Sequence, residues 1–405
     1  MEKKKDSGIK KPGPILYNIC AWLSYAVIRI LFKFKRPKPI EGLEPPFVVL
    51  ANHTCNFDFM VLASSIYPIR ANYVIASRFS NSSRIAGAFF KVLRTISKYQ
   101  FQPDLGAIRK MVEVIRIGGV LAMYPYGQRP YHGSAAEMPP GLGKLLKLLK
   151  CDVVAVKTDG GSFTNPKWAK YIRRGLIDVD FSRILTKEEI ADMDSESIEE
   201  LVKMRLMFND YEWNREKQRE FRGKKLAEGI EKILYKCPKC KTEYSISATG
   251  DIISCSECTA AGTMLATGFI KSDDFIFDNP YDWVEWQRQE AREEAQKNGV
   301  VIAGKGSLEI RVKNEIDREE PVPGLLALTK DGLTFESAGG HETKHYSPTK
   351  LGLVANKLGR HFEIGDNSAA NRFIIDNPLS VMKWILACEA VYDLFMENKA
   401  SAIRN

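Results

Sequence analysis

The chain has 405 residues, of which 44% are hydrophobic and 27% are charged. This composition excludes an intrinsically disordered chain and permits two or three domains, each with its own core. The formal net charge is +9, but residues 1–110 hold 18 Lys or Arg against 6 Asp or Glu, and the rest of the chain holds 41 against 44. A basic N-terminal region is complementary in charge to anionic lipid headgroups and phosphorylated ligands. Nucleic acid is not expected as a partner, because no motif interleaves basic with aromatic residues.

The first predicted element is an apolar and aromatic helix from Ile15 to Phe32, with basic residues on both sides. A helix that crosses a bilayer needs about 20 apolar residues, and this helix is slightly short and contains Arg29. We therefore expect it to lie in a membrane interface, with Trp22 and Tyr25 at headgroup depth. A single membrane span and a helix of the soluble core are the alternatives. A cleaved signal peptide is not expected, because no small-residue cleavage site follows.

The next prediction is a buried strand at Phe47–Ala51, followed by a helix that begins near Asp58. His53 lies in the turn between them, and such turns at the end of a sheet often carry reactive side chains. A histidine held by a carboxylate can act as a general base toward a hydroxyl group. The spacing of His53 and Asp58 also occurs by chance, so the pair predicts a site only together with further motifs.

A second motif follows about seventy residues later, in Val120–Arg129. It is another apolar strand that runs into a turn containing Pro125 and Gly127, where the backbone can approach a ligand closely. Arg129 ends the motif with a planar, permanently charged guanidinium that suits phosphate. A further apolar strand is predicted at Cys151–Lys157.

This order of motifs resembles the glycerolipid acyltransferase family, whose best-known members are the 1-acyl-glycerol-3-phosphate acyltransferases. The family's first block is His, four residues and Asp, and His53 and Asp58 match it. Its third block is Phe-Pro-Glu-Gly-Thr-Arg, which is matched at Pro125, Gly127 and Arg129. The resemblance extends over roughly residues 15 to 180.

The other positions of these blocks are less well matched. Lys98 and Arg94 are both candidates for the basic residue of the second block. Tyr126 replaces the glutamate that helps to shape the acceptor pocket in the family, and a tyrosine carries no charge at neutral pH. Gln128 replaces the commonest threonine, and Ala155 replaces the proline of the last block.

The resemblance implies an enzyme that moves a fatty acyl group from acyl-CoA or acyl-carrier protein to the hydroxyl of a lysophosphatidate-like lysophospholipid, in phospholipid synthesis. His53 would be the catalytic base and Asp58 would orient it. The implied substrate-binding residues are Gly127, Arg129, Tyr126 and Gln128. Gly127 and neighbouring amides are also candidates to stabilise the developing oxyanion. Two alternatives stay open: a thiol nucleophile at Cys55, and a non-catalytic lipid-binding or scaffold homologue in which Tyr126 marks lost turnover.

A highly charged helical arm is predicted at 183–235. Thr186 and Glu189 form a capping box that opens its first helix. Further helices are predicted at Ile198–Met207 and Arg215–Leu234. We interpret the arm as solvated, with a lid over an acyl channel as the alternative.

The segment 236–268 contains two Cys-x-x-Cys pairs, Cys237 with Cys240 and Cys255 with Cys258. This spacing predicts a closed, structural Zn²⁺ site of four thiolates in a zinc ribbon, and disulfides are the alternative. Short strands are expected at Thr242–Ser247 and Gly250–Ser254. Ala260 lies near the second pair, at a position where a glycine would make the turn of the chain easier to form. Reduced cysteines indicate a cytosolic setting.

A helical connector is predicted at 269–303, and short strands follow in the C-terminal module at 304–400. The expected strands include Leu308–Val312, Leu325–Leu328, Leu333–Phe335, Leu351–Val354, His361–Ile364 and Arg372–Ile375. Lys330–Gly332 would form a hairpin turn. A final helix from about Pro378 would place Trp384 in the core. The pattern resembles a pleckstrin-homology barrel closed by a helix.

The predicted fold class is therefore α/β. It has a mixed sheet flanked by helices, a small zinc ribbon and a C-terminal β-barrel-like module closed by a helix. The predicted segments are a basic membrane-binding segment at 1–40, an acyltransferase domain at 41–182, and the four segments given above. The expected partners are membrane lipids, a lysophospholipid acceptor and acyl-carrier protein. The expected location is the cytoplasmic face of a membrane, either peripheral or with one N-terminal span.

Overall fold

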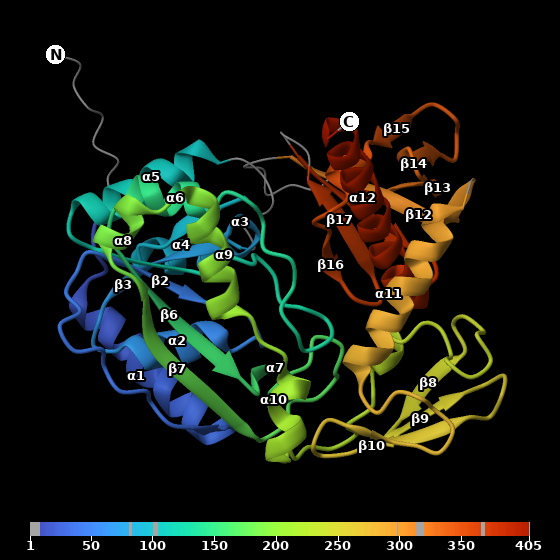
Figure 1. Cartoon of the computed structure of the whole chain (residues 1–405), viewed down its shortest axis with the longest axis horizontal. Helices are drawn as coiled ribbons and strands as arrows, with labels where there is room; N and C mark the ends of the chain where they lie inside the picture. The colour runs from blue at the N-terminus through green and yellow to red at the C-terminus, as the bar shows by residue number, and fades with distance from the viewer. Residues whose placement is uncertain are drawn as a thin grey trace. The chain divides into compact units, whose positions relative to one another are not determined.

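The computed structural model describes residues 9–80, 83–99, 104–297, 299–312, 320–365 and 369–404 (Figure 1). The first eight residues of the predicted membrane-binding segment lie outside this part. The chain divides into two compact units. Unit 1 comprises Met1–Pro166 and Arg173–Arg222, and unit 2 comprises Lys167–Ile172 and Gly223–Asn405. This division is coarser than the six predicted segments.

Unit 1 is built on a mixed seven-stranded sheet, in agreement with the predicted α/β class. The strand order is β1-β7-β6-β2-β5-β3-β4. The neighbours are parallel except β6 and β7, which are antiparallel. The strands are β1 Lys33–Phe34, β2 Phe47–Ala51, β3 Ala71–Ala76, β4 Ile96–Lys98, β5 Val120–Met123, β6 Asp152–Asp159 and β7 Leu176–Leu185.

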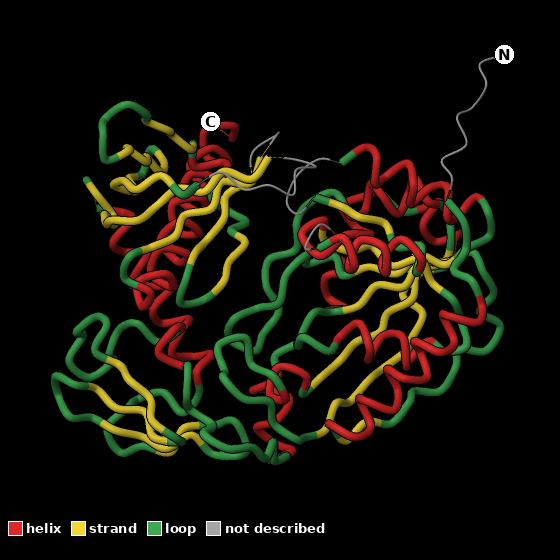
Figure 2. Tube along the Cα trace, turned by 180° about the vertical axis from the view of Figure 1, so that it is seen from behind, coloured by secondary structure: helices red, strands yellow, loops and turns green. Residues whose placement is uncertain are grey.

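Helices cover both faces of this sheet, which explains why every residue of β2 is buried (Figures 1 and 2). Val48 and Leu50 belong to the apolar cluster that also takes residues from α5, α6 and α9. Phe47 and Val49, which alternate with them, belong to the cluster on the α2 face. The helices of unit 1 are α1 Pro14–Leu31, α2 Asp58–Ile66, α3 Ser77–Ser80, α4 Arg84–Val92, α5 Leu105–Arg116, α6 Leu142–Leu149, α7 Gly161–Thr164, α8 Lys187–Asp192, α9 Ser195–Leu206 and α10 Asp210–Lys217.

The parallel strands bring four connections to one edge of the sheet. Because β2, β3, β5 and β6 run in the same direction, their carboxyl ends meet there. The segments that leave this edge are the loop before α2, the helix α3, the turn after β5 and the helix α7. Ligands of α/β sheets bind outside the carboxyl ends of the strands. This edge is therefore the place in unit 1 where a site is expected.

The charged arm is partly as predicted. The capping box of Thr186 and Glu189 is present at the start of α8, and α9 follows close to its predicted bounds. The helix predicted at Arg215–Leu234 is wrong, because α10 ends at Lys217. Gln218 adopts a left-handed conformation with φ of 47°. The chain then turns so that Phe221 is buried in unit 1, which a continuous helix could not achieve.

Unit 2 begins with a small antiparallel sheet around the four cysteines. Its strand order is β11-β10-β9-β8. Two strands pair as predicted, β8 with β9, but β8 begins at Ile246, four residues after the predicted start at Thr242. Two more strands follow that the sequence did not predict. The strands are β8 Ile246–Thr249, β9 Ile252–Cys255, β10 Ala261–Met264 and β11 Ile270–Lys271, preceded by the short 3₁₀ helix η1 Ile230–Lys232.

A second antiparallel sheet and two helices complete unit 2. Its strand order is β15-β14-β13-β12-β18-β17-β16. The predicted hairpin at Lys330–Gly332 is confirmed by the pairing of Thr329 with Gly332. The elements are α11 Pro280–Gln296, β12 Val300–Val312, β13 Val322–Thr329, β14 Gly332–Ser337, β15 Thr343–Tyr346, η2 Pro348–Lys350, β16 Ala355–Lys357, β17 His361–Gly365, β18 Ala369–Ile375, η3 Pro378–Ser380 and α12 Val381–Arg404.

The final helix packs on this sheet through Trp384, which is 1% exposed and stacks on Phe362 at 6.0 Å between ring centroids. The predicted core position of Trp384 is thereby confirmed. The strand predicted at Leu351–Val354 is wrong, because the segment is a bend and the strand starts at Ala355. Leu351 and Val354 are buried from this bend, so their apolar character reflects burial rather than a strand.

Candidate active site

The loop between β2 and α2 brings His53 and Asp58 into direct contact. His53 Nδ1 hydrogen-bonds Asp58 Oδ2, and Asp58 is the first residue of α2, as the sequence predicted. The same carboxylate accepts from the Thr54 amide at 2.6 Å and from the Thr54 hydroxyl at 2.7 Å. The Cys55 amide donates to it at 3.0 Å. The loop thus wraps around the carboxylate and points its donors at it.

These contacts determine the charge of Asp58 and the tautomer of His53. Burial alone would raise the pKa of Asp58, but the hydrogen bonds from His53 and Thr54 outweigh it and lower that pKa below 3.8. The carboxylate is therefore an anion that can only accept, so His53 donates from Nδ1 and keeps Nε2 as an acceptor. The His53 side chain is 27% exposed, whereas Asp58 is buried. This arrangement can serve as an oriented general base.

Cys55 does not fit the alternative of a thiol nucleophile. It is fully buried, and its Sγ donates to Asp58 Oδ1 at 3.2 Å. Burial and the charge of Asp58 raise the pKa of the thiol well above 9. Since the thiolate is the reactive form, this cysteine is held in its inert form.

Two contacts that the sequence did not predict position the loop. The Asn52 side chain donates to the Thr158 carbonyl and accepts from the Thr158 amide, both at 2.7 Å, so it ties the end of β2 to β6. The backbone of α7 packs closely on Thr54: a Cβ at Gly161 would lie 2.1 Å from the Thr54 hydroxyl oxygen. Any larger residue at Gly161 would therefore displace a donor of Asp58.

The turn after β5 places Tyr124 beside the base. The Tyr124 and His53 rings lie 4.9 Å apart. Gly127 has φ of 73°, which favours glycine, and its amide donates to the Tyr124 carbonyl at 3.1 Å. That amide closes the turn, so the structure gives it no separate oxyanion role. Gln128 follows in the same turn and is half-buried.

Tyr126 lies in the core rather than at the surface of the turn. It is 3% exposed and belongs to the apolar cluster on the α5 and α6 face. Its hydroxyl has no hydrogen-bond partner among the described residues, and burial followed by the charge of Glu137 raises its pKa to about 12. These observations favour a packing role, and the substrate contact assigned to Tyr126 stays a prediction.

Arg129 is held next to the loop by a residue that the sequence missed. Arg129 Nη1 donates to the Asn165 carbonyl at 3.0 Å and to the Asn165 side-chain oxygen at 3.3 Å. The same side-chain oxygen accepts from the Asn56 amide at 3.3 Å. Asn165, which follows α7, therefore joins the guanidinium to the His53 loop. The positive charge of Arg129 also acts on Cys55 beside Asp58.

The structure separates the two candidates for the second block. The parallel pairing of β3 with β4 places Lys98 opposite Ala76, at the carboxyl end of both strands. Arg94 precedes β4, and its carbonyl accepts from the Asn72 side chain near the start of β3. Lys98 is therefore at the same edge of the sheet as His53, whereas Arg94 is at the opposite edge.

A second buried carboxylate, that of Asp210, accepts hydrogen bonds from the first turn of α7. Its oxygens accept from the Gly160 amide at 2.7 Å, from the Ser162 amide at 2.9 Å and from the Ser162 hydroxyl. Asp210 is fully buried, and this burial raises its pKa from 3.8 to about 7 despite the three hydrogen bonds. The sequence did not point to Asp210, which is one of many acidic residues in the arm.

This raised pKa predicts a pH dependence of stability. A carboxyl with a higher pKa in the folded state stabilises below its unfolded pKa and loses this contribution as the pH rises through the folded value. From 3.8 to about 7, the free energy of unfolding should lose at most about 4 kcal/mol relative to Asp210→Asn. Thermal or urea unfolding of both proteins between pH 4 and 8 measures the difference. Parallel profiles would show that Asp210 does not titrate in this range.

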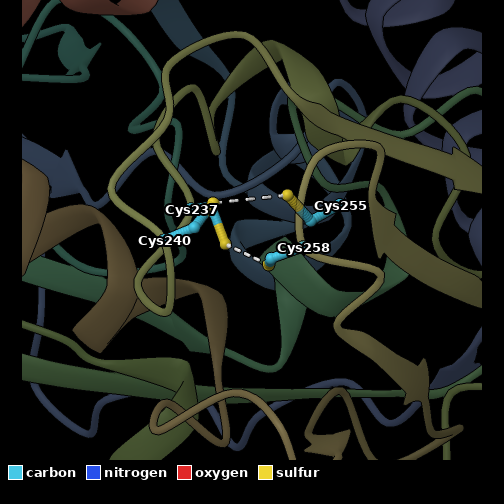
Figure 3. A group of neighbouring side chains, drawn as sticks. All are labelled: Cys237, Cys240, Cys255 and Cys258. Carbon is cyan, nitrogen blue, oxygen red and sulfur yellow. Dashed lines mark hydrogen bonds between the residues drawn. The ribbon is translucent and has the colours of Figure 1, made fainter.

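The four cysteines of unit 2 gather as predicted (Figure 3). Their Sγ atoms all lie within 4.8 Å of one another. Two pairs, Cys237 with Cys258 and Cys240 with Cys255, are 3.7 Å apart. Four Zn–S bonds of ~2.3 Å in a tetrahedron place the sulfurs ~3.8 Å apart, so the four cysteines fit a Zn²⁺ ion bound by four thiolates.

The turns of the two Cys-x-x-Cys pairs are similar. Lys241 and Thr259, each directly after the second cysteine of its pair, have φ of 64° and 57°. In the second turn the left-handed residue is therefore Thr259, which directly precedes Ala260. The ribbon is also tied to the helices of unit 2 by ion pairs: Lys236 binds Glu290 at 2.7 Å and Lys383 binds Glu243 at 2.7 Å.

The comparisons with known proteins agree with the motifs of unit 1. The sequence model of the family described as Acyltransferase matches residues 31–158, about a third of the chain. This matched region contains His53, Asp58 and Arg129. No curated protein matches the chain. Among solved structures, the 1-acyl-sn-glycerophosphate (LPA) acyltransferase PlsC from Thermotoga maritima is similar at 16% identity and a TM-score of 0.37, with 47% of this chain and 78% of that chain covered.

Proposed function

We propose that this acyltransferase domain transfers a fatty acyl group from a thioester donor, acyl-CoA or acyl-carrier protein, to the hydroxyl of a lysophosphatidate-like lysophospholipid. The observation that carries the proposal is the His53–Asp58 contact at the carboxyl edge of β2, with Arg129 held beside it by Asn165. The acyl donor and the acceptor are parts of the proposal, whereas the acyltransferase family of residues 31–158 is given by the match.

The geometry supports a direct transfer without an acyl-enzyme. The acceptor hydroxyl attacks the thioester carbonyl while Nε2 of His53 takes its proton, because Nδ1 is engaged by Asp58. An ester C–O bond forms and the C–S bond breaks. The proton on His53 then passes to the leaving thiolate, which restores the neutral base. Asp58 stabilises the transient imidazolium, as the carboxylate does in serine hydrolases.

Arg129 is the proposed binding group for the acceptor phosphate. Its guanidinium is a planar fork with five donors, and Asn165 holds it next to the His53 loop. A planar fork binds phosphate through two parallel hydrogen bonds, which a lysine cannot reproduce. The link through Asn165 to Asn56 would hold the phosphate at a constant distance from His53.

Replacement of Arg129 with lysine should therefore affect phosphorylated acceptors selectively. We expect kcat/KM for lysophosphatidate to fall about tenfold or more, since hydrogen bonds to charged groups contribute about 1.5–3 kcal/mol each. Transfer to monoacylglycerol, which lacks the phosphate, should change little. Arg116→Lys on the exposed face of α5 is the matched control. An equal decrease for both acceptors would contradict phosphate binding by Arg129.

The helix α1 supports attachment to a membrane interface. Among the described residues it is the helix that is long and apolar enough to cross a membrane, with 18 residues and a mean hydropathy of 1.4. One face packs on unit 1 through Tyr17, Ala21 and Ile28, and the Tyr17 hydroxyl accepts from the Ala71 amide at 3.3 Å. The other face exposes Trp22 and other apolar residues. A helix bound to its own domain along one face favours an interfacial position over a span.

In unit 2 we propose that Cys237, Cys240, Cys255 and Cys258 hold a structural Zn²⁺. Their spacing, their sulfur geometry and their all-protein donor set support a closed site. The C-terminal sheet closed by α12 is kept as a pleckstrin-homology-like module in this proposal. We also propose a cytoplasmic setting, in which thiols stay reduced.

A further inference from the structure

The short helices α3 and α4 form an apolar surface that no part of the proposed chemistry uses. α3 follows β3 at the carboxyl edge of the sheet, the edge that also carries His53 and the turn after β5, and α4 then leads back toward the start of β4 (Figure 1). None of the described side chains of α4 is buried. Gly87 and Phe90 are only half-buried, so the described side chains of α4 contribute little packing energy within their own domain, which is unusual for a helix of a soluble protein.

The exposed residues of α4 form a stripe. Ile85, Phe89 and Val92 are spaced by four and three positions, so they lie on one face of the helix. Their exposed fractions are 84%, 48% and 55%, and Phe79 of α3 is 50% exposed. Single exposed apolar residues are common, whereas a contiguous group indicates a surface that is covered in the functional state.

The charge around this stripe is of one sign. Between Phe59 and Pro103 the chain has six Lys or Arg and no Asp or Glu. Arg84 and Lys91 lie on α4 itself and are exposed. An apolar stripe flanked by cations is complementary to an anionic lipid surface, where the apolar side chains enter the acyl boundary and the cations contact headgroups.

We propose that the α3–α4 surface, defined as Phe79, Ile85, Phe89, Val92, Arg84 and Lys91, inserts into the headgroup layer of an anionic membrane. It is a second membrane contact beside α1, and α3, at its start, lies at the carboxyl edge of the sheet. A lysophospholipid could then reach His53 and Arg129 without leaving the bilayer interface. The choice of a bilayer as the occupant rests on the proposed lipid substrate, but the test of binding does not require turnover.

Binding to vesicles tests this surface directly. All proteins carry His53→Ala, so that no turnover occurs, and they are floated with vesicles of phosphatidylcholine alone or mixed equally with phosphatidylglycerol. The double variant Ile85→Ser/Phe89→Ser should bind the mixed vesicles about tenfold or more weakly, since two apolar side chains lose their burial. Arg84→Gln/Lys91→Gln should bind mixed vesicles about tenfold more weakly and neutral vesicles equally. The matched control is Leu148→Ser/Met204→Ser, which replaces two exposed residues of α6 and α9.

Several outcomes decide the proposal. It is overturned if the α4 variants and the control bind equally, with all melting temperatures alike. It is also overturned if the α4 variants lose self-association or retention on immobilised acyl-carrier protein while vesicle binding is unchanged, because the surface would then contact a protein. If lysophospholipid acylation is never observed but vesicle binding changes as expected, the proposed function fails and the membrane contact stands.

Discussion

Replacement of His53 with alanine is expected to lower kcat/KM for acyl transfer about 10²- to 10⁴-fold, the usual contribution of a positioned general base. The effect arises from the loss of the Nε2 acceptor, since Asp58 is buried, accepts from the loop amides and cannot take over the proton. Transfer of a labelled acyl group from acyl-CoA to lysophosphatidate measures the change. The fold should survive, because the His53 side chain is partly exposed and its removal leaves no large cavity.

Two matched variants make this prediction specific. His341→Ala replaces an exposed histidine of unit 2 and should leave kcat/KM unchanged. Asp58→Asn should also lower activity strongly, because an amide presents a donor where Thr54 and Cys55 already donate and cannot stabilise the imidazolium. It should reduce the melting temperature as well, since Asp58 is buried among these donors. Equal activity of the wild type and His53→Ala would contradict the assignment of His53 as the catalytic base.

Replacement of Cys255 with serine is expected to have the second largest effect, on the stability of unit 2. The site is closed, and structural zinc contributes about 10–16 kcal/mol of binding free energy in small zinc-binding peptides. The β8–β11 sheet is small, so its fold would depend on the proposed ion. We expect the variant to lose bound zinc and several kcal/mol of unfolding free energy. Elemental analysis and thermal unfolding measure the two effects.

Cys20→Ser provides the control for this variant. Cys20 is a half-buried thiol of α1 in unit 1, remote in sequence from the four ligands. Its replacement should leave zinc content and melting temperature unchanged. Freshly purified wild-type protein that contains no zinc, or a Cys255→Ser protein as stable as the wild type, would refute the zinc site.

The sequence predicted those parts of the site whose contacts are local. His53 and Asp58 are five residues apart, and a strand-to-helix turn suffices to bring them together. The two cysteine pairs are similarly close in sequence. The supporting contacts are not local: Asn52 meets Thr158 across 106 positions, and Asn56 meets Asn165 across 109. They depend on the pairing of β2 with β6, which periodicity does not specify.

Tertiary packing explains both the burial of Tyr126 and the two predicted elements that are wrong. Tyr126 lies in a turn motif, and nothing in the motif shows that its side chain enters the core of the α5 and α6 face. The predicted helix after Arg215 fails because Phe221 is buried against Phe163, at 5.0 Å between ring centroids. Leu351 and Val354 are apolar because they are buried from a bend. In each case long-range burial overrides the local pattern.

The central claim is the acylation of a phosphate-bearing lipid alcohol by the acyltransferase domain, and product analysis tests it most directly. Purified protein is incubated with lysophosphatidate, lysophosphatidylcholine or monoacylglycerol and with isotope-labelled acyl-CoA or acyl-carrier protein, and the lipids are identified by mass spectrometry. We predict labelled phosphatidate as the main product, formed by the wild type and absent with His53→Ala. No labelled ester with any acceptor, or equal product from both proteins, would contradict the assignment.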